Sequence, residues 1–305
     1  MSFSSDTKKE LCKVHNTSVA ENVAECYGLL LFCKHFSAKK IVFNTESYAV
    51  ASRFCQLISE TFAVIVEQTS VLTGRHGGGK IFTITFPIES ECGKIYKHFG
   101  YMGNEINRRI NRAVFDDELC IAAFLRGAYL CCGSVNNPEK DYHLEFAVPY
   151  QNLCKDLIKI ISDVDQLTYS LKMVERKGAY VAYLKDSEQI SDLLAFIDAS
   201  IASINIIETK IIKEIRNDTN RKINSEVANM RKTITAAMEQ IKAIEKIQDS
   251  VGLENLSDEL REVAQLRLNN PDLSLRALGE MLNPPISRSG VNHRIKKLLE
   301  LADGK

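Results

Sequence analysis

The sequence of 305 residues predicts an α+β domain that is duplicated and pseudo-symmetric, followed by an all-α helix-turn-helix domain. One order of helices and strands occurs twice, over about residues 20–100 and 118–200. The last third has almost no strand pattern, and its final helices are short, capped and closely spaced. We therefore expect three parts: a duplicated domain over 1–205, a helical connector over 206–250 and a helix-turn-helix domain over 251–305.

The composition is that of an ordinary globular protein, with 45% hydrophobic and 26% charged residues. Because the formal net charge is +0, any nucleic-acid surface has to be local. The nine cysteines show neither C-x-x-C nor zinc-ligand spacing, which favours buried thiols in a reducing compartment. No apolar run is as long as a membrane span. We expect a cytoplasmic protein without cofactor, metal or membrane partner.

The first repeat begins with residues 22–36, which are apolar nearly all round and therefore predict a buried helix. The segment "KIVF" (40–43) reads as a strand, and residues 47–60 show helical spacing of apolar side chains. Two strands, "FAVIVE" (62–67) and "KIFTITFPI" (80–88), follow, with a loop between them.

The second repeat returns to the same order about a hundred residues later. Its expected elements are a helix over 118–133, a strand over 142–148, a helix over 150–163, hairpin strands over 165–173 and 178–186, and a closing helix over 187–198. Two copies of this order imply two small antiparallel sheets, each with helices on one face.

The last third opens with a long helical stretch, 208–251, for which a break near 217–224 is considered. Three helices follow. Ser257 caps the first, which ends at Asn269, and Ser274 caps the second. Ser287 or Ser289 caps the third, which reaches Ala302.

The final helix carries the strongest functional pattern. At about 100° per residue, its apolar side chains share a narrow arc that faces the core, namely Val291, Ile295, Leu298 and Ala302. Ser289, His293 and Lys296 point the opposite way, and no acidic residue occurs between Ile286 and Leu299. Lys and Arg neutralise phosphates, Asn reads adenine and Arg reads guanine. The predicted DNA-binding residues are Ser274, Arg276, Ser287, Arg288, Ser289, Asn292, His293, Arg294, Lys296 and Lys297.

A second basic stretch lies in the long helical region. It offers further contacts to the DNA backbone through Arg216, Arg221, Lys222 and Arg231. A polar helix junction without a ligand explains the same residues equally well.

Three segments, "FLRGAYLCCGSVNNPEKDYHLEF", "NRKINSEVANMRKT" and "SLRALGEMLNPPISRSGVNHRIKKLLELA", closely resemble the bacterial WhiA family. The resemblance covers essentially the whole chain. It implies a degenerate domain of the LAGLIDADG homing-endonuclease type and a helix-turn-helix domain similar to region 4 of sigma factors. It also implies a DNA-binding regulator tied to cell division, chromosome segregation or sporulation.

The resemblance also assigns the paired helices of the duplicated domain. It places Gly28 and Gly127 at their contact, and Cys33 and Cys132 where homing endonucleases carry their catalytic acids. Soft thiols do not suit Mg²⁺, so we expect no catalytic activity. A zinc or redox site between the two cysteines is a minor alternative. Residues 116–118 are expected to interact with a helix dipole.

Two further patterns are set aside. "GRHGGGKI" (74–81) resembles a P-loop, but Ile81 replaces the required Ser or Thr and a strand follows. Its Arg75, His76 and Lys80 remain weak candidates for DNA contact. His143 lies among alternating apolar residues and is expected to be structural.

The sequence therefore predicts a non-catalytic protein that binds double-stranded DNA with sequence preference and associates with the nucleoid. The final helix would enter the major groove. One alternative is a surviving metal-dependent nuclease with carboxylates recruited from elsewhere. Another is an adaptor that docks a division or transcription partner and touches DNA weakly.

Overall fold

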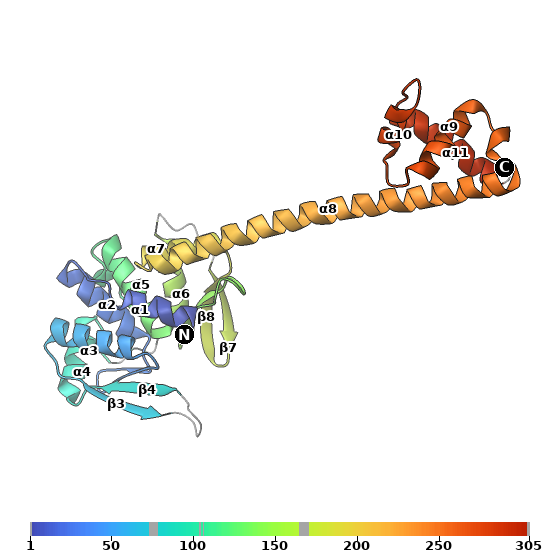
Figure 1. Ribbon diagram of the computed structural model, residues 1–305. Coiled ribbons are helices and arrows are strands. Elements are labelled where there is room, and N and C mark those ends of the chain that lie inside the picture. The colour runs from blue at the N-terminus through green and yellow to red at the C-terminus, as the bar shows by residue number, and fades with distance from the viewer. Residues whose placement is uncertain (1, 73–78, 104, 106, 165–170, 304–305) are drawn as a thin grey trace. The chain divides into compact units, whose positions relative to one another are not determined.

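The computed structural model describes residues 2–72, 79–103, 105, 107–164 and 171–303, and Figure 1 shows the arrangement of their elements. The chain forms two compact units, Met1–Lys213 and Glu214–Lys305. The first combines helices with two sheets, and the second is helical. The predicted α+β fold followed by an all-α domain is confirmed.

The first unit contains two copies of one topology. After α1 (Phe3–Leu11), the first copy consists of α2 (Val19–Leu31), β1 (His35–Phe36), β2 (Ile41–Thr45), α3 (Tyr48–Phe62), β3 (Glu67–Leu72), β4 (Lys80–Thr85) and α4 (Glu89–His98). After a short turn, η1 (Arg112–Val114), the second consists of α5 (Glu118–Cys132), β5 (Gly133–Val135), β6 (Leu144–Val148), α6 (Gln151–Ser162), β7 (Lys172–Arg176), β8 (Ala179–Leu184) and α7 (Ser187–Phe196). The antiparallel sheets have equivalent strand orders, β1-β2-β4-β3 and β5-β6-β8-β7. The duplication is thus visible in the strand pairing.

Helices α2 and α5 pack against each other at the centre of this unit. Their starts are fixed by side-chain caps: Ser18 accepts a hydrogen bond from the Glu21 N–H, and Asp117 accepts one from the Cys120 N–H. A Cβ on Gly28 would stand 2.1 Å from the Phe124 carbonyl oxygen, and one on Gly127 would stand 2.2 Å from the Glu25 carbonyl oxygen. Only glycine allows two backbones to come this close.

Around this helix pair lies one hydrophobic core. Tyr27 of α2 stacks on Phe99 with ring centroids 4.6 Å apart and lies 5.3 Å from Phe124 of α5. The sheets contribute fully buried aromatic rings, Phe43 from β2 and Phe146 from β6. The predicted burial of the first helix is confirmed, because every residue of α2 from Ala24 to Leu31 is buried.

A buried ionic cluster closes one side of the helix pair. Glu25 is 0% exposed and accepts two hydrogen bonds from Arg53, at 3.0 and 2.8 Å. Arg126, which is 2% exposed, lies 3.3 Å from the same carboxylate and also pairs with Asp198. Paired in this way, the buried charges tie both central helices to α3 and to the end of α7.

Several predicted boundaries in the first unit are wrong. The first helix ends at Leu31 rather than residue 36, because His35–Phe36 pairs with β2. "FAVIVE" is not a strand: α3 runs to Phe62, Ala63 adopts φ 52°, and the strand is Glu67–Leu72. Most of the predicted strand 165–173 lies outside the described residues, and β7 starts at Lys172.

The helical part begins with α8 (Ser200–Ser250), which is continuous, so the break considered near 217–224 does not occur. A short turn, η2 (Leu253–Asn255), leads to α9 (Asp258–Asn269), α10 (Leu275–Met281) and α11 (Arg288–Ala302). These helices share a core with the end of α8, in which Ile244, Val263, Leu278 and Ile295 are buried. In the described part of the chain, no helix is both long and apolar enough to cross a membrane.

Candidate nucleic-acid interface

Helices α10 and α11 form a tight pair whose starts are capped by serine. Ser274 accepts a hydrogen bond from the Ala277 N–H at 3.2 Å, as the sequence predicts. Ser287 accepts one from the Gly290 N–H at 3.2 Å, so Ser287 is the cap and the alternative, Ser289, lies inside α11.

The turn between these helices passes close to α10. A Cβ on Gly279 would stand 2.3 Å from the Ile286 carbonyl oxygen, and the Ile286 N–H donates to the Gly279 carbonyl at 3.0 Å. Because a side chain would block this approach, Gly279 sets how α11 leaves the turn.

The inward face of α11 is the one that the sequence predicts. Val291, Ile295 and Leu298 are at most 1% exposed, and Ala302 is 8% exposed. They pack against α9, α10 and the end of α8. Burial of this face fixes the rotation of α11 and therefore determines which polar side chains face solvent.

The outward face of α11 is polar and locally cationic. Within α11, the exposed members of the predicted set are Arg288, Ser289, Asn292, His293, Lys296 and Lys297. Acidic residues are absent from 286–299, all of which the structure describes. An exposed helix face with hydrogen-bond donors, an amide and two lysines can contact both base edges and phosphates.

The predicted arginines differ in their exposure and in their ion pairs. Arg294 is half-buried and lies 3.4 Å from Glu259 of α9, so it joins two helices of the domain. Arg276 is exposed and pairs with Glu280 one turn along α10, at 3.1 Å. Arg288, the first residue of α11, is exposed.

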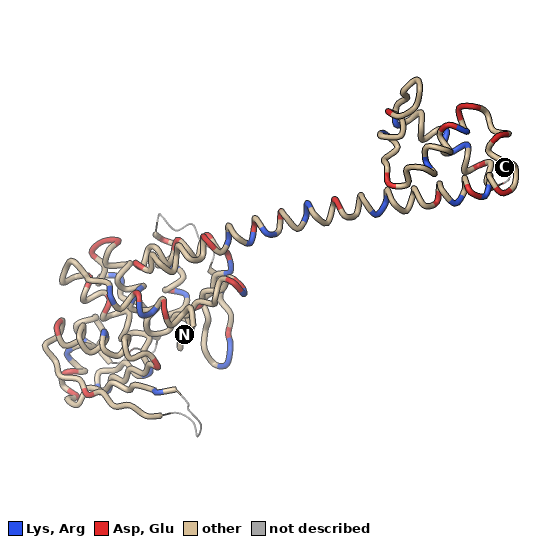
Figure 2. Tube along the Cα trace, in the orientation of Figure 1, with Lys and Arg blue, Asp and Glu red and all other residues tan. Residues whose placement is uncertain are grey.

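The predicted backbone contacts on α8 are spread along an exposed helix. Arg216, Arg221, Lys222 and Arg231 are all exposed, and Arg221 lies 3.6 Å from Asp218. Lys and Arg alternate with Asp and Glu along α8 (Figure 2). Basic and acidic side chains are therefore interspersed along this helix.

Helix α8 has a second set of polar residues that the sequence pattern had not pointed to. Asn229, Lys232, Thr233 and Gln240 line a groove together with residues of α9, α10 and α11. Their helical spacing was a usable signal, because positions 229, 232, 233, 236 and 240 share one side of a helix.

Cys33 and Cys132, which the resemblance places where homing endonucleases carry catalytic acids, belong to the hydrophobic core of the first unit or pack against it. Cys132 is the last residue of α5, and Cys33 lies in the turn after α2, where its thiol donates to the His35 carbonyl at 3.0 Å. Burial raises the pKa of both thiols, that of Cys132 to about 12. Both side chains are therefore neutral thiols near pH 7 and behave as small hydrophobic groups.

A lysine occupies the same end of α5. The Lys8 ammonium of α1 donates to the Leu130 carbonyl at 3.1 Å and lies 5.9 Å above the Tyr129 ring. Desolvation by burial lowers the pKa of Lys8, while neighbouring cysteines act against this shift. The end of α5 thus has a cation that complements its helix dipole.

Metal-ligating side chains do not gather in the described residues. No group of three or more His, Cys, Asp or Glu side chains there is arranged to hold a metal ion. Glu25, a buried carboxylate of α2, is already engaged by two arginines.

Lys80 and His143, from the patterns set aside above, lie at or directly before the start of a strand. Lys80 begins β4, so a strand follows the glycine-rich segment, as expected. The Lys80 ammonium lies 5.2 Å above the Phe82 ring. Arg75 and His76 lie outside the described residues. His143 precedes β6, contacts Glu145 at 3.0 Å and stacks on Tyr183, in keeping with a structural role.

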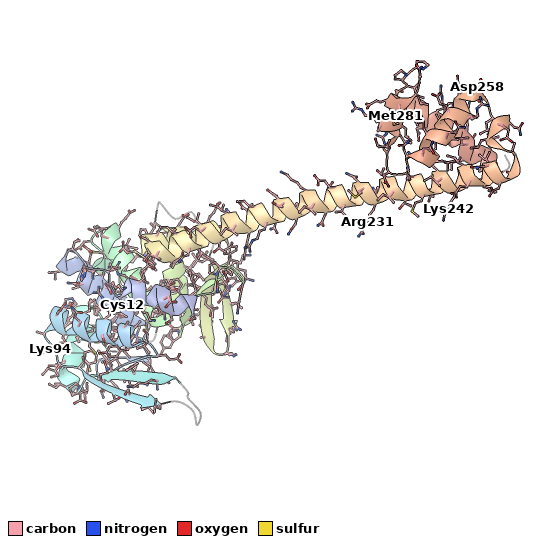
Figure 3. All side chains as sticks on the ribbon, in the orientation of Figure 1. Cys12, Lys94, Arg231, Lys242, Asp258 and Met281 are labelled. Atoms are coloured by element: carbon pink, nitrogen blue, oxygen red, sulfur yellow. The ribbon has the colours of Figure 1, made fainter. Side chains whose placement is uncertain are left out.

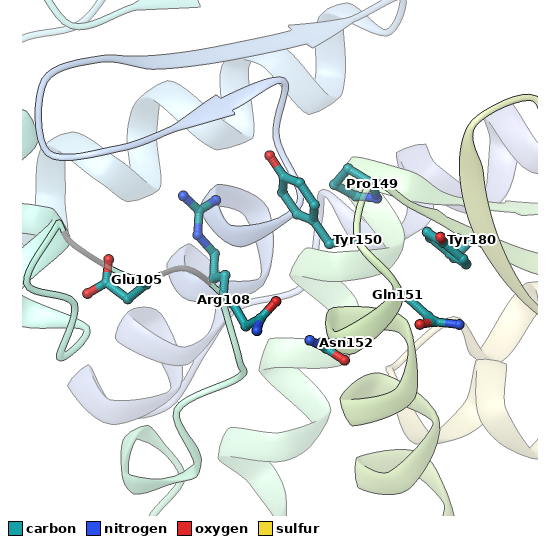
Figure 4. Close-up of a pocket in the computed structure, with 8 residues that line it drawn as sticks. Glu105, Arg108, Pro149, Tyr150, Gln151, Asn152 and Tyr180 are labelled. Carbon is teal, nitrogen blue, oxygen red and sulfur yellow. The ribbon is translucent and has the colours of Figure 1, made fainter.

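The first unit has a separate hollow of about 500 Å³, shown in Figure 4. Arg108 and Tyr150 lie side by side there, with the guanidinium 5.9 Å from the ring centroid. Arg108 also donates to the Phe36 carbonyl at 2.6 Å and lies over the rings of Phe36 and Tyr96. These contacts hold Arg108 in the packing of the first unit.

Comparisons with known proteins agree with this architecture. Family models described as the WhiA LAGLIDADG-like domain and the WhiA C-terminal HTH domain match residues 121–216 and 219–302. The chain is 39% identical to a "Probable cell division protein WhiA" of Thermoanaerobacter sp. (strain X514), covering 99% of this chain and 97% of that protein. A protein of the same name from Clostridium botulinum is 37% identical, with 99% and 98% covered.

A solved structure is also similar over its full length. The "full-length DUF199/WhiA from Thermatoga maritima" superposes with a TM-score of 0.61 at 27% identity, covering 99% of this chain and 98% of that one. The duplicated domain, the helix-turn-helix domain and both full-length relatives agree in one conclusion: the chain belongs to the WhiA family.

Proposed function

We propose that the chain binds double-stranded DNA with sequence preference by placing α11 in the major groove. The observation that carries this proposal is the exposed, acid-free face of α11, held by a fully buried opposite face. A capped pair of helices with such a second helix is the arrangement of helix-turn-helix DNA readers.

The chemistry of the face suggests a division of roles. Asn292 and His293 are hydrogen-bonding groups suited to base edges, whereas Lys296 and Lys297 are point charges suited to phosphates. Ser289 lies in the first turn of α11, where the helix dipole favours an anion. Arg294 would act by holding α11 against α9 through Glu259.

Single-residue variants of the full chain test this proposal. Asn292→Ala and His293→Ala should each reduce discrimination for the preferred site by about 1–3 kcal/mol. Lys296→Ala and Lys297→Ala should weaken binding to all DNA and each lower the salt-dependence slope by about 1. Lys246→Ala, an exposed lysine elsewhere on α8, is the control. Unchanged binding by all four α11 variants in fluorescence anisotropy titrations would refute the assignment.

We further propose that the chain does not cleave DNA. Neutral thiols at Cys33 and Cys132 and the ammonium of Lys8 replace hard oxygen ligands at the ends of the paired helices. Supercoiled plasmid incubated with the protein and Mg²⁺ or Mn²⁺ should stay intact. Nicking that depends on the protein and stops with EDTA would favour the nuclease alternative.

The biological setting is proposed from the relatives. Their name, "Probable cell division protein WhiA", supports a role in cell division. We extend this proposal to a nucleoid-associated role in chromosome segregation or sporulation-linked transcription, because the chain is proposed to bind DNA. Mapping chromosome occupancy of the tagged protein in its own cells would test this: occupancy at discrete sites is expected, and no enrichment over untagged cells would contradict it.

A second candidate function is docking of a division or transcription protein. Many apolar side chains of α8 are exposed, including Ile211, Ile215, Ile223, Met230 and Ile234. A variant with Ser at Ile211 and Ile215 that binds DNA normally but fails to restore division in a deletion strain would favour docking over DNA binding alone. Full restoration would argue against it.

A further inference from the structure

The second unit contains a groove that the helix-turn-helix pair alone does not account for. It has a volume of about 540 Å³ and lies between α8 and the starts of α10 and α11. The lining residues that matter here are Lys232, Thr233, Gln240, Arg267, Arg276 and Arg288.

The charge of this groove is positive. Lys232 comes from α8, Arg276 from α10 and Arg288 from α11, and the described lining includes neither Asp nor Glu. Arg276 also forms an ion pair with Glu280. Arg288 is the first residue of α11. Cations from three helices converging on one hollow create a local potential that attracts anions.

Two buried polar groups in the lining have no hydrogen-bond partner among the residues that the structure describes. They are the Oε1 of Gln240, which is 8% exposed, and the Nε of Arg267, which is 1% exposed. The other side of the Arg267 guanidinium donates to the carbonyl of Leu273 at 2.7 Å, which fixes its position. A buried polar atom left unpaired costs about 1–3 kcal/mol, so such atoms normally meet a ligand or water.

A phosphate group would satisfy both the charge and the unpaired donor. Its oxygens can accept from the ammonium of Lys232, and the Arg267 Nε–H, which is covered in the free protein, would join them once the side chains over it move aside. The Gln240 amide can turn to present its NH₂ group, because its oxygen and nitrogen are nearly isosteric. Asn229 and Thr233 add neutral donors from α8.

We propose that this groove holds a phosphate of the DNA backbone beside the base-reading face of α11, which makes α8 part of the DNA interface. The inference rests on the proposed DNA-binding function. It goes beyond that function by adding Lys232, Gln240 and Arg267, none of which lies on α11.

The test uses the full chain and a labelled random-sequence DNA duplex, titrated at several salt concentrations. Lys232→Ala should lower the slope of log K against log salt by about 0.9, the value for one phosphate contact. Gln240→Glu, which places a carboxylate in the groove, should weaken binding further than Gln240→Met.

Lys242→Ala is the matched control. Lys242 is an exposed lysine of the same helix, and it lies nine positions after Thr233, about half a turn out of phase with it (Figure 3). Its loss removes the same charge from α8 without touching the groove lining. Equal losses by Lys232→Ala and Lys242→Ala would show a general charge effect and overturn the proposal. Thermal melts of each variant check that the second unit stays folded.

A second measurement identifies the source of the phosphate. The Arg267 Nε–H signal in an NMR spectrum should shift on addition of the DNA duplex, and the shift should be lost in Lys232→Ala. If inorganic phosphate produces the full shift and leaves DNA affinity unchanged, the groove is a site for free phosphate and the backbone assignment is wrong.

The outcomes also separate this inference from the proposed function. If the α11 variants lose DNA binding while Lys232→Ala keeps it, only the groove inference fails. If the unaltered chain does not bind DNA at all, the proposed function fails first.

Discussion

At the scale of single residues, packing accounts for both the glycines and the cysteines of the paired helices. Gly28 and Gly127 are required because each faces backbone of the opposite helix at a distance that no Cβ can occupy. Cys33 and Cys132, at the helix ends, are free thiols, the first buried and the second half-buried, and such thiols pack as small hydrophobic groups. The glycines are thus explained by close contact between two backbones, and the cysteines by the packing of small hydrophobic side chains.

Gly28→Ala should destabilise the first unit by about 3 kcal/mol or more, because the methyl group would meet the Phe124 carbonyl and the Ala128 N–H, both backbone. Urea denaturation followed by circular dichroism measures the change. Gly93→Ala is the control: it lies in α4, its Cβ would be 3.4 Å from the Ala38 carbonyl, and helix propensity favours alanine. Comparable losses in both variants would contradict the close-contact explanation.

Asp156 predicts a specific pH dependence. Burial would raise the pKa of Asp156, but hydrogen bonds from Arg109 at 2.7 Å and from the Ile110 N–H at 3.0 Å outweigh it and lower the pKa. A carboxyl whose pKa is lower in the folded state stabilises the protein above its unfolded pKa of about 3.9 and loses this contribution as the pH falls through the folded value.

Asp156→Ala should therefore cost about 2 kcal/mol at neutral pH, and its difference from the parent should shrink in acid. Urea denaturation at several pH values checks this. Asp163, whose pair with Arg112 is about half exposed, serves as the comparison, since exposed pairs contribute about 0–1 kcal/mol. A cost for Asp156→Ala that is independent of pH would disprove the role of the charge.

At the scale of elements, helices with caps and a buried stripe could be predicted, whereas edge strands could not. Ser274 and the apolar arc of α11 fix their elements locally. Strand β3 is exposed along its length, so it lacks the apolar alternation that identifies a strand, and the two-residue β1 exists only through pairing with β2. At the candidate site, the rotation of α11 was predictable. The pairing of Arg294 with Glu259 was not, because it depends on how α9 packs.

The cap of α11 gives a test at this scale. Ser287→Ala should destabilise the second unit by about 1 kcal/mol, because the Gly290 N–H loses its acceptor. Ser289→Ala should leave stability within about 0.5 kcal/mol, since Ser289 is an exposed residue inside the helix. Thermal melts of both variants compare them directly, and a reversed order would place the cap at Ser289.

At the scale of the whole molecule, neutrality overall coexists with a basic helix and a basic groove in one unit. The formal net charge is +0, yet residues 286–299 carry only cationic charges. Each unit has its own hydrophobic core, and the α8 residues from 214 to 236 are exposed. We therefore expect the two units to unfold separately, and a variant that destabilises only the first unit should leave DNA contact by the second unchanged.

Calorimetry of the full chain should accordingly show two unfolding transitions. Gly28→Ala should lower only one of them, because its contacts lie within the first core. Ile295→Ala, which removes a side chain 1% exposed in the second core, should lower only the other, by about 2–5 kcal/mol of unfolding free energy. Since α11 depends on that second core for its rotation, the same variant should lose DNA affinity while Gly28→Ala retains it. A single transition that both variants shift together would mean that the two cores unfold as one.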